Sequence, residues 1–307
     1  LVNSIMLQRF RHIVHIIIAY ISDYLSLLGR PLFYQIQFQH FRNDFDNNTK
    51  RRKLCLLGNG PSFSLIEKHL DQLKDFDFCA VNLSVNTDLF FKLKPKMLVM
   101  VDMLFWQKPE SEHIKKAWDN IQRIDWAIQI FIPYDFPYHI KEAFEKNKNV
   151  TVRRYANNSW EPETKYANRI KMWLYKKGLV SPNFSNVSLS AIYAAILCGY
   201  KEINLLGVEH SWMKDIGVNN CNEVVVVDRH YYGENETVWR NYDGTPIRLI
   251  DFLSSQLVTF TGHLYLQEFA DYMNVKIFNR TTGSFIDAYE KRTLDTLFDD
   301  KEITKDE

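Results

Sequence analysis

The five residues at positions 58–62 have the composition of a phosphate-binding turn. They are Gly58, Asn59, Gly60, Pro61 and Ser62. They stand between the apolar run 54–57 and a helical pattern with Phe63, Ile66 and Leu70 on one face. Glycines let a backbone approach a phosphate closely, and a helix N-terminus offers free N–H groups with a partial positive charge. The turn lacks the third glycine of a dinucleotide fingerprint and the Lys-Ser/Thr of a P-loop, so it predicts a nucleotide-type ligand without specifying one. A plain N-cap role for Ser62 is the structural alternative.

Polar residues also follow several other predicted strands. In an open α/β sheet, ligands bind beyond the carboxyl ends of the strands. The candidate ligand-binding residues at these ends are Asn82, Asp102, Gly207, Glu209, Thr282 and Ser284. Their recurrence at one edge of the predicted sheet is a stronger signal than any single residue, because polar side chains are common in loops. Glu209 and Asp102 could hold a ribose hydroxyl or a divalent cation.

The segment that follows the four valines at 224–227 contains two candidates for a general base. An imidazole titrates near neutral pH, which suits His230, and Glu234 is the second candidate. His210 could pair with His230 as a metal ligand or a phosphate contact, but two histidines without a third ligand do not predict a metal site. The structural alternative for His230 is a loop histidine that bonds to a backbone carbonyl.

The elements that must position these residues alternate between strands and helices from Lys53 onward. The predicted strands are 53–57, 76–81, 97–101, 127–133, 150–153, 202–206, 223–227 and 275–279. The predicted helices are 63–74, 111–123, 138–146, 187–197 and 263–273. This alternation predicts an α/β fold with a mostly parallel sheet and helices on both faces. Residues 155–185 interrupt it and predict a helical insert, either a lid over the site or an ordinary excursion.

Length, charge and cysteine content restrict the class of protein. The 307 residues suffice for one large domain or two small ones, and the net charge of +1 argues against a dedicated nucleic-acid binder. Residues 1–53 carry a net charge of +5, which leaves −4 on the rest of the chain. A basic leading segment on a mildly acidic body predicts an anionic partner surface, above all lipid. The four cysteines show no metal-binding spacing and favour a reducing cytoplasm.

The leading segment has the pattern of an amphipathic helix over residues 10–29. Polar residues interrupt it too often for a membrane span, which needs about 20 largely apolar residues, and it has no signal-peptide cleavage site. We expect residues 5–30 to lie on a membrane surface, or else to pack against the body or a second subunit. The predicted organisation is a membrane-associating or packing segment at 1–50, a main domain at 51–290 and a charged tail at 291–307.

Four segments resemble the bacterial sialyltransferases of glycosyltransferase family 42. The turn 58–62 resembles the family's opening loop, and residues 188–209 resemble its small-residue helix, Gly-Tyr-Lys-Glu-Ile block and Gly-x-Asp strand end. Residues 230–233 are similar to its His-Tyr-x-Gly segment, and residues 278–286 to its closing strand. The wider group includes flagellin-glycosylating motility accessory factors and archaeal hydroxymethylpterin pyrophosphokinases. The matching segments follow the family's order and cover most of residues 53–290.

The resemblance implies a Rossmann-like sugar transferase that takes a CMP-activated nonulosonate and needs no metal or other cofactor. Asn59 and Asn82 match family asparagines that contact the nucleotide and the sugar. Ser188 lies near the family's phosphate-binding segment, and Tyr231 matches a tyrosine that holds the leaving phosphate.

This chain departs from the family's pattern at three positions. The family's catalytic histidine directly follows the glycine of His-Tyr-x-Gly, and Glu234 occupies that place here. The base therefore remains open between His230 and Glu234. Asp102 replaces a ribose-contacting asparagine, and Glu209 replaces the aspartate of Gly-x-Asp.

Together these observations predict an inverting, base-assisted glycosyltransferase of surface polysaccharide or lipooligosaccharide assembly. Its donor would be CMP-sialic acid or a related CMP-sugar, and its acceptor a glycan or glycolipid. We expect a cytoplasmic protein that is peripheral on the inner face of the cell membrane, with its oligomeric state open. The alternatives are an Mg²⁺-dependent pyrophosphokinase-like phosphotransferase and a non-catalytic scaffold that keeps a nucleotide fold.

Overall fold

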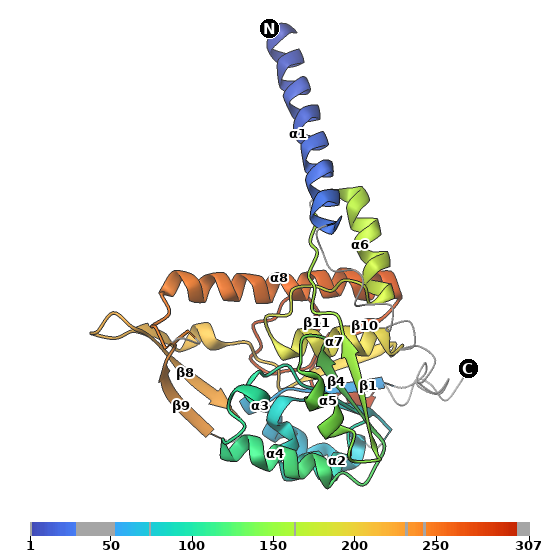
Figure 1. Ribbon diagram of the computed structural model, residues 1–307, viewed down its shortest axis with the longest axis vertical. Helices are drawn as coiled ribbons and strands as arrows, with labels where there is room; N and C mark the ends of the chain where they lie inside the picture. The colour runs from blue at the N-terminus through green and yellow to red at the C-terminus, as the bar shows by residue number, and fades with distance from the viewer. Residues whose placement is uncertain are drawn as a thin grey trace.

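Eight parallel strands form the centre of the molecule (Figure 1). The computed structural model describes residues 2–28, 53–73, 75–162, 164–230, 233–241 and 244–299. The strands of the main sheet are β1 (Lys53–Leu57), β2 (Asp77–Val81), β3 (Met97–Val99), β4 (Ile128–Pro133), β5 (Val150–Tyr155), β6 (Glu202–Leu206), β10 (Lys276–Asn279) and β11 (Glu290–Lys291). Their order is β11-β10-β6-β1-β2-β3-β4-β5, and each neighbouring pair is parallel. The predicted α/β class with a parallel sheet is confirmed.

Helices cover both faces of this sheet. The helices after the leading one are η3 (Pro61–Leu73), η4 (Asn82–Asn86), α2 (Asp88–Leu93), α3 (Leu104–Gln107), α4 (Glu112–Gln122), α5 (Tyr138–Phe144), α6 (Lys165–Lys177), α7 (Val187–Leu197), η5 (Trp212–Lys214), α8 (Leu249–Met273) and α9 (Thr296–Asp299). Among them, α6 contacts α8 and the leading helix α1 (Val2–Leu28), while η5 contacts β8 (Val224–His230). Side chains alternate across a strand, so Leu54 and Leu56 join the core cluster of α7, whereas Cys55 and Leu57 join that of η3. Helix α7 is buried between α8 and strands β1, β2 and β3.

Two predicted helices differ in type or extent from the observed ones. The segment predicted as a helix at 63–74 is the 3-10 helix η3, which begins at Pro61. The segment predicted at 263–273 is the second half of α8, which begins at Leu249.

The valine-rich strand belongs to a different sheet from the one predicted. Strands β7 (Ile216–Val218), β8 (Val224–His230) and β9 (Gly233–Val238) form an antiparallel sheet of three strands. The prediction that 223–227 ends at the rim of the main sheet is therefore wrong, because β8 pairs, among the described strands, only with β7 and β9. The observed strand also continues to His230. Val224 and Val226 are buried with Phe252 of α8, whereas Val225 is half-buried. Burial of one face only is typical of an antiparallel strand, not of a central parallel one.

Helix α1 (Val2–Leu28) stands away from the body and is joined to it near its C-terminal end (Figure 1). Trp160 Nε1 donates hydrogen bonds to Asp23 O at 3.3 Å and to Ser26 Oγ at 3.0 Å. Thr164 donates to Asp23 Oδ2 through its backbone N at 3.2 Å and through Oγ1 at 2.8 Å. The predicted helix is confirmed, and its last turns pack on the body. None of the helices in the described ranges combines the length and hydropathy needed to cross a membrane.

The insert 155–185 and the segment 291–299 both contain a helix that packs on the rest of the protein. The predicted helical character of 155–185 is confirmed by α6, which lies beside α1 and contacts α8 (Figure 1). Residues 291–299 of the predicted charged tail are in contact with the body. Leu297 is fully buried, and Arg280 Nη1 donates to Thr293 O at 2.8 Å and Thr296 Oγ1 at 2.7 Å. The connector 29–52 and residues 300–307 lie outside the described residues.

Candidate functional site

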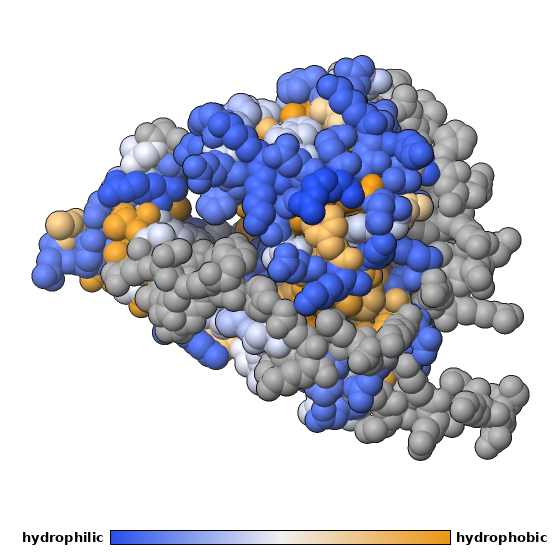
Figure 2. Space-filling view, turned by 90° about the horizontal axis from the view of Figure 1, so that it is seen from below, coloured by the Kyte–Doolittle hydropathy of each residue, from blue (hydrophilic) through white to orange (hydrophobic). Residues whose placement is uncertain are grey.

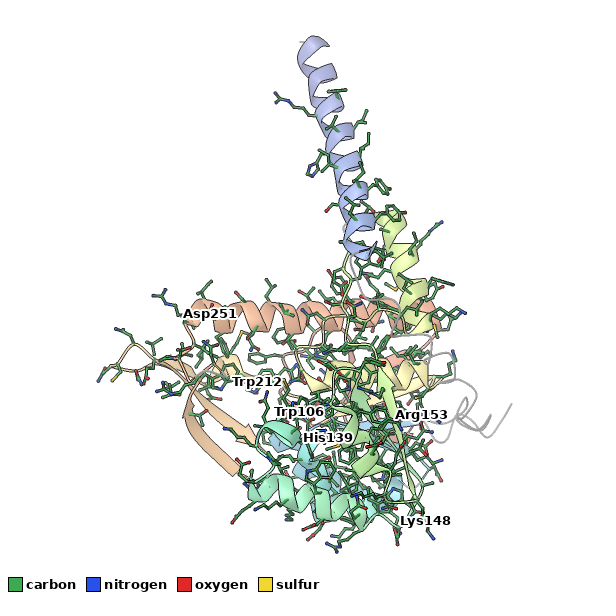
Figure 3. The ribbon with its side chains drawn as sticks, viewed as in Figure 1. Trp106, His139, Lys148, Arg153, Trp212 and Asp251 are labelled. Atoms are coloured by element: carbon green, nitrogen blue, oxygen red, sulfur yellow. The ribbon has the colours of Figure 1, made fainter. Side chains whose placement is uncertain are left out.

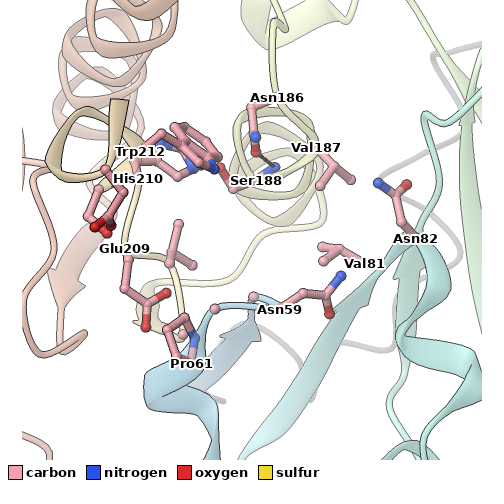
Figure 4. Close-up of a pocket in the computed structure, with 16 residues that line it drawn as sticks. Asn59, Pro61, Val81, Asn82, Asn186, Val187, Ser188, Glu209, His210 and Trp212 are labelled. Carbon is pink, nitrogen blue, oxygen red and sulfur yellow. Dashed lines mark hydrogen bonds between the residues drawn. The ribbon is translucent and has the colours of Figure 1, made fainter. Parts of the chain in front are cut away.

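A pocket opens at the carboxyl end of β1, between the turn 58–62, the end of β6 and the N-terminus of α7 (Figure 4). Strand β1 lies between β2 and β6, so the chain runs outward from it in both directions. Ligands of α/β folds bind at such a switch point. The lining residues are Gly58, Asn59, Gly60, Pro61, Val81, Asn82, Asn186, Val187, Ser188, Gly207, Val208, Glu209, His210, Ser211, Trp212 and Asp215.

The two glycines of the turn pack directly against the end of β6. Gly58 N donates to Leu206 O at 2.7 Å, and Gly60 N donates to Gly207 O at 2.9 Å. A Cβ atom on Gly58 would lie 2.1 Å from Gly207 O, and one on Gly60 would lie 1.4 Å from Glu209 Oε2. Both positions therefore require glycine because of contacts inside the chain, independently of any ligand.

Glu209 occupies the N-terminal end of η3, where we expected a ligand phosphate. Its Oε1 accepts a hydrogen bond from the Ser62 backbone N at 2.8 Å. A carboxylate of the chain thus already satisfies this end of η3 and repels a second anion there. Glu209 is 9% exposed, and its Oε2, like Ser62 Oγ, has no hydrogen-bond partner among the described residues. The free oxygen can accept a hydrogen bond from a ligand hydroxyl, which fits the predicted ribose contact.

The opposite wall of the pocket offers amide and hydroxyl groups without charge. Asn186 caps α7, and its Oδ1 accepts from Ser188 N at 2.9 Å. Asn82 has a left-handed backbone, with φ at 44°, and its Oδ1 accepts from Val101 N at 3.0 Å. The side chains of Asn59, Asn82 and Asn186 border the same hollow in Figure 4. Their amide nitrogens are donors that an anionic ligand can use.

The charged groups of the pocket are acidic. Among the described lining residues, Glu209 and Asp215 carry carboxylates, and none is Lys or Arg. Across the described ranges, no three His, Cys, Asp or Glu side chains come together as a ligand set for a metal ion. An anion in this pocket would therefore be bound by neutral hydrogen-bond donors of the chain.

A chain of buried hydrogen bonds leads from the pocket into the core. Ser188 Oγ lies 3.2 Å from His210 Nε2, and His210 Nδ1 lies 3.3 Å from His263 Nε2. His263 Nδ1 lies 2.9 Å from the hydroxyl of Tyr289. The His210 ring stacks on Trp212, with 4.7 Å between ring centroids and 26° between planes. Trp212 lies below α8 in Figure 3.

Burial keeps the titratable side chains of this hydrogen-bond chain uncharged. It lowers the pKa of His210 to about 3. It also lowers the pKa of His263 well below its ordinary value, and proximity to His210 lowers it further. Burial raises the pKa of the Tyr289 hydroxyl, so this group stays protonated. The two ring nitrogens of His210 thus face Ser188 and His263. The predicted pairing of His210 with His230 stays a prediction, because the His230 side chain lies outside the described part of the structure.

Three predicted ligand-binding residues lie away from the pocket. Asp102 Oδ1 accepts a hydrogen bond from Leu104 N at 2.9 Å, just before α3. Thr282 borders a different hollow, beside Arg280 and Arg292. Ser284 Oγ is buried, where it donates to Val208 O at 2.9 Å and accepts from Asn279. Asp102 and Ser284 thus make hydrogen bonds within the fold.

The candidate bases lie on the β8–β9 hairpin. His230 pairs with Gly233 and Arg229 with Glu234 in the strand register. The side chains of His230 and Glu234 lie outside the described part of the structure, as does all of Tyr231. The assignment of the base therefore stays a prediction.

Sequence reasoning missed several pocket and core residues. Asn186 had a sequence signal, because it stands at an N-cap position directly before the α7 pattern. Trp212 and Asp215 lie at the short helix η5 and directly after it, where the sequence shows no periodic pattern. His263 and Tyr289 carried no signal, because they meet His210 through tertiary packing alone.

No protein-family model matches the chain, and no curated protein matches its sequence. Among solved structures, it is similar to a MAf glycosyltransferase from Magnetospirillum magneticum AMB-1, with a TM-score of 0.46 and 11% identity over 88% of this chain and 40% of that one. It is also similar to the sialyltransferase CstII from Campylobacter jejuni, solved in complex with a substrate analogue, cytidine-5'-monophosphate. That match has a TM-score of 0.37 and 16% identity, over 78% of this chain and 84% of that one. The chain thus spans about two fifths of the Magnetospirillum protein. Both proteins are of the kinds that the sequence motifs resemble, whereas the fold given above rests on the strand pairing of this chain itself.

Proposed function

We propose that the chain is a glycosyltransferase that binds a CMP-sugar in the pocket at the end of β1. The observation that carries this proposal is the charge of the pocket, whose described lining offers neutral donors, two carboxylates and no Lys or Arg. A CMP-nonulosonate carries one phosphodiester charge and one carboxylate charge on separate groups, each of which neutral donors can bind. Nucleoside di- and triphosphates concentrate two or more charges on adjacent phosphates, which proteins usually balance with Mg²⁺, Lys or Arg.

The proposed placement of the donor follows from the two walls of the pocket. Glu209 Oε2 would accept a hydrogen bond from a ribose hydroxyl, because it is buried and without a partner among the described residues. The phosphate would lie across the pocket near Ser188, at the positive end of α7 and away from the Glu209 carboxylate. Asn59 and Asn82 would contact the remaining polar groups of the donor, as the family resemblance implies.

The proposed reaction transfers the sugar with inversion. A base deprotonates a hydroxyl of the glycan or glycolipid acceptor, and that oxygen attacks the anomeric carbon in line. The bond from this carbon to the phosphate oxygen breaks, and CMP leaves with the bonding electrons. His230 and Glu234 are the proposed bases. Sialic acid or a related nonulosonate is the proposed sugar, by resemblance.

The test of this proposal is a comparison of ligands by thermal stabilisation. CMP at 100 times its dissociation constant should stabilise the protein by about 2.7 kcal/mol. Glu209→Gln keeps one carbonyl oxygen for Ser62 but replaces Oε2 with a donor, so it should weaken CMP binding by roughly tenfold. CMP-sialic acid should be hydrolysed or transferred in the presence of EDTA. Stabilisation by ATP with Mg²⁺ but not by CMP would favour the phosphotransferase, and no effect of any nucleotide would favour the scaffold.

We further propose that the protein binds the inner face of the cell membrane through α1 and the outer side of α8. Large apolar side chains are exposed on both helices, namely Phe10, Ile13, Val14, Ile17, Ile18, Ile21, Tyr24 and Leu25 on α1 and Leu249, Ile250, Leu253, Leu257 and Leu264 on α8. Side chains of α1 project into open space in Figure 3, whereas the coloured part of the face opposite α1 is mainly hydrophilic in Figure 2. This asymmetry supports a lipid surface on the α1 side.

Vesicle co-sedimentation tests the membrane proposal. Ile17→Glu should reduce binding to anionic vesicles on the order of tenfold, because it removes an exposed apolar contact from the middle of α1. Ser22→Glu is the matched control, since it adds the same charge to an exposed polar position. Equal retention of both variants would contradict the proposal. Concentration-dependent dimerisation that only Ile17→Glu abolishes would identify a second copy as the partner instead.

A further inference from the structure

The hydrogen-bond chain from Ser188 to Tyr289 has a defined direction. A neutral imidazole donates through one ring nitrogen and accepts through the other. His210 and His263 are both neutral. If the outer nitrogen of one ring accepts a hydrogen bond, its inner nitrogen must donate to the other ring, whose outer nitrogen must then donate in turn. The partners at the two ends therefore decide which way every bond of the chain points.

Tyr289 sets this direction because it is the buried end. Its side chain is 4% exposed, and the one hydrogen-bond partner of its hydroxyl among the described residues is His263 Nδ1. If His263 donated to Tyr289, the phenolic proton would be buried without an acceptor, which is unfavourable. Tyr289 therefore donates to His263 Nδ1, His263 Nε2–H donates to His210 Nδ1, and His210 Nε2–H donates to Ser188 Oγ.

The consequence appears at Ser188. Its Oγ accepts from His210, so its own proton has no acceptor among the described residues and is available to the pocket that Ser188 lines. With the opposite tautomer, His210 Nε2 would accept this proton and withdraw it from the pocket. Hydrogen bonds in such a chain also polarise one another, which strengthens the terminal donor.

We propose that His210, His263 and Tyr289 are positioning residues that fix the Ser188 hydroxyl as a hydrogen-bond donor to an anionic oxygen of the bound ligand. This inference rests on the proposed function, in which that oxygen belongs to the phosphate of the CMP-sugar. The packing of the ring supports it, because His210 is stacked on Trp212 and meets Phe260 edge-on, with 6.5 Å between centroids. The imidazole is thereby held in one orientation toward Ser188.

The first test removes the buried end of the chain. Tyr289→Phe should lower CMP affinity by roughly 3- to 10-fold, the value of one neutral hydrogen bond, although Tyr289 does not line the pocket. Tyr193→Phe is the matched control, because it also deletes a buried hydroxyl, one that donates to Tyr175 O and Val180 O and takes no part in the chain. It should change CMP affinity less than twofold. In a Ser188→Ala background, Tyr289→Phe should have no further effect. A wild-type affinity of Tyr289→Phe, or an undiminished effect in Ser188→Ala, would overturn the proposal.

The second test reads the tautomers directly and needs neither ligand nor variant. In ¹⁵N NMR spectra of the free protein, His210 and His263 should both carry their proton on Nε2. An Nδ1-protonated His210 would overturn the positioning role even if CMP binds. Failure of the wild type to bind CMP would instead refute the proposed function, while the tautomers would still report on the direction of the chain.

Discussion

Replacing Gly58 with alanine should damage the seam between the turn 58–62 and the end of β6. The added Cβ would lie 2.1 Å from Gly207 O and 2.7 Å from Gly207 C. Ordinary carbon contacts are about 3.5 Å, so the backbone must move by more than about 1 Å. Both contact atoms belong to the backbone, so no side-chain rotation can relieve the strain.

The expected loss of stability follows from what this movement breaks. The seam contains the bonds Gly58 N to Leu206 O at 2.7 Å and Gly60 N to Gly207 O at 2.9 Å. Each contributes about 1 kcal/mol net, and overpacking in a rigid environment adds about 1–3 kcal/mol. Gly58→Ala should therefore lower the free energy of unfolding by about 3–5 kcal/mol, a large fraction of the stability of a typical domain.

Urea unfolding followed by circular dichroism measures this loss. The matched control is Gly217→Ala in β7, where the new Cβ meets Val225 Cγ2 at an ordinary 3.4 Å. This control should unfold within about 1 kcal/mol of the wild type. Equal midpoints for the two variants, with equal denaturant slopes, would refute the reasoning from close contacts.

Three further changes have outcomes that follow from the described contacts. Asp23→Ala removes the acceptor of both Thr164 bonds and should accelerate hydrogen exchange in the last turns of α1, whereas the exposed neighbour Ser22→Ala should not. Burial raises the pKa of Glu161 to about 7, against the lowering effect of Lys171. The unfolded chain releases this proton near pH 4.5, whereas the native state retains it to about pH 7. The free energy of unfolding should therefore fall by about 3 kcal/mol as pH rises from 4.5 to 7. Urea unfolding of Glu161→Gln should not show this fall. His210 should make stability depend on pH in the opposite direction. Its pKa in the folded protein is lowered to about 3, so the unfolded chain binds the proton first as pH falls below 6.5. Stability should therefore decrease with acidification, and His210→Phe should reduce the slope by up to about 1.4 kcal/mol per pH unit in unfolding measurements at pH 4–6.

The sequence predicted the parallel strands well for a physical reason. Strands buried on both faces read as short apolar runs bounded by polar residues, and 53–57 and 202–206 are such runs with unchanged bounds in the structure. The run before His230 looks the same, but it pairs in an antiparallel sheet that buries one face on α8. A run of four valines does not distinguish these two environments.

The site could be predicted only where it depends on local sequence. Residues 58–61 of the turn and Glu209 line the pocket as expected, because they closely follow two neighbouring strands, whereas the predicted Ser62 is not among the lining residues. The pairing of His210 with His263 spans 53 positions and depends on how α8 packs, which no local pattern encodes. Leu297 was taken for part of a tail because its neighbours are charged, although the burial of Leu297 and the hydrogen bonds from Arg280 hold the segment on the body.

The way in which α1 is attached also determines the reach of the pocket. The helix has 27 residues, so it is about 40 Å long, and the body holds it near one end. If its far end touches the membrane while the helix stands upright, the body is lifted by that length, and under the proposed function only a long, extended glycan would bring its terminal sugar to the pocket. If the helix lies flat, the exposed leucines of α8 approach the bilayer, and an acceptor a few sugars long is near enough. The tilt of α1 would in this way select acceptors by their length, without any contact to the sugar itself.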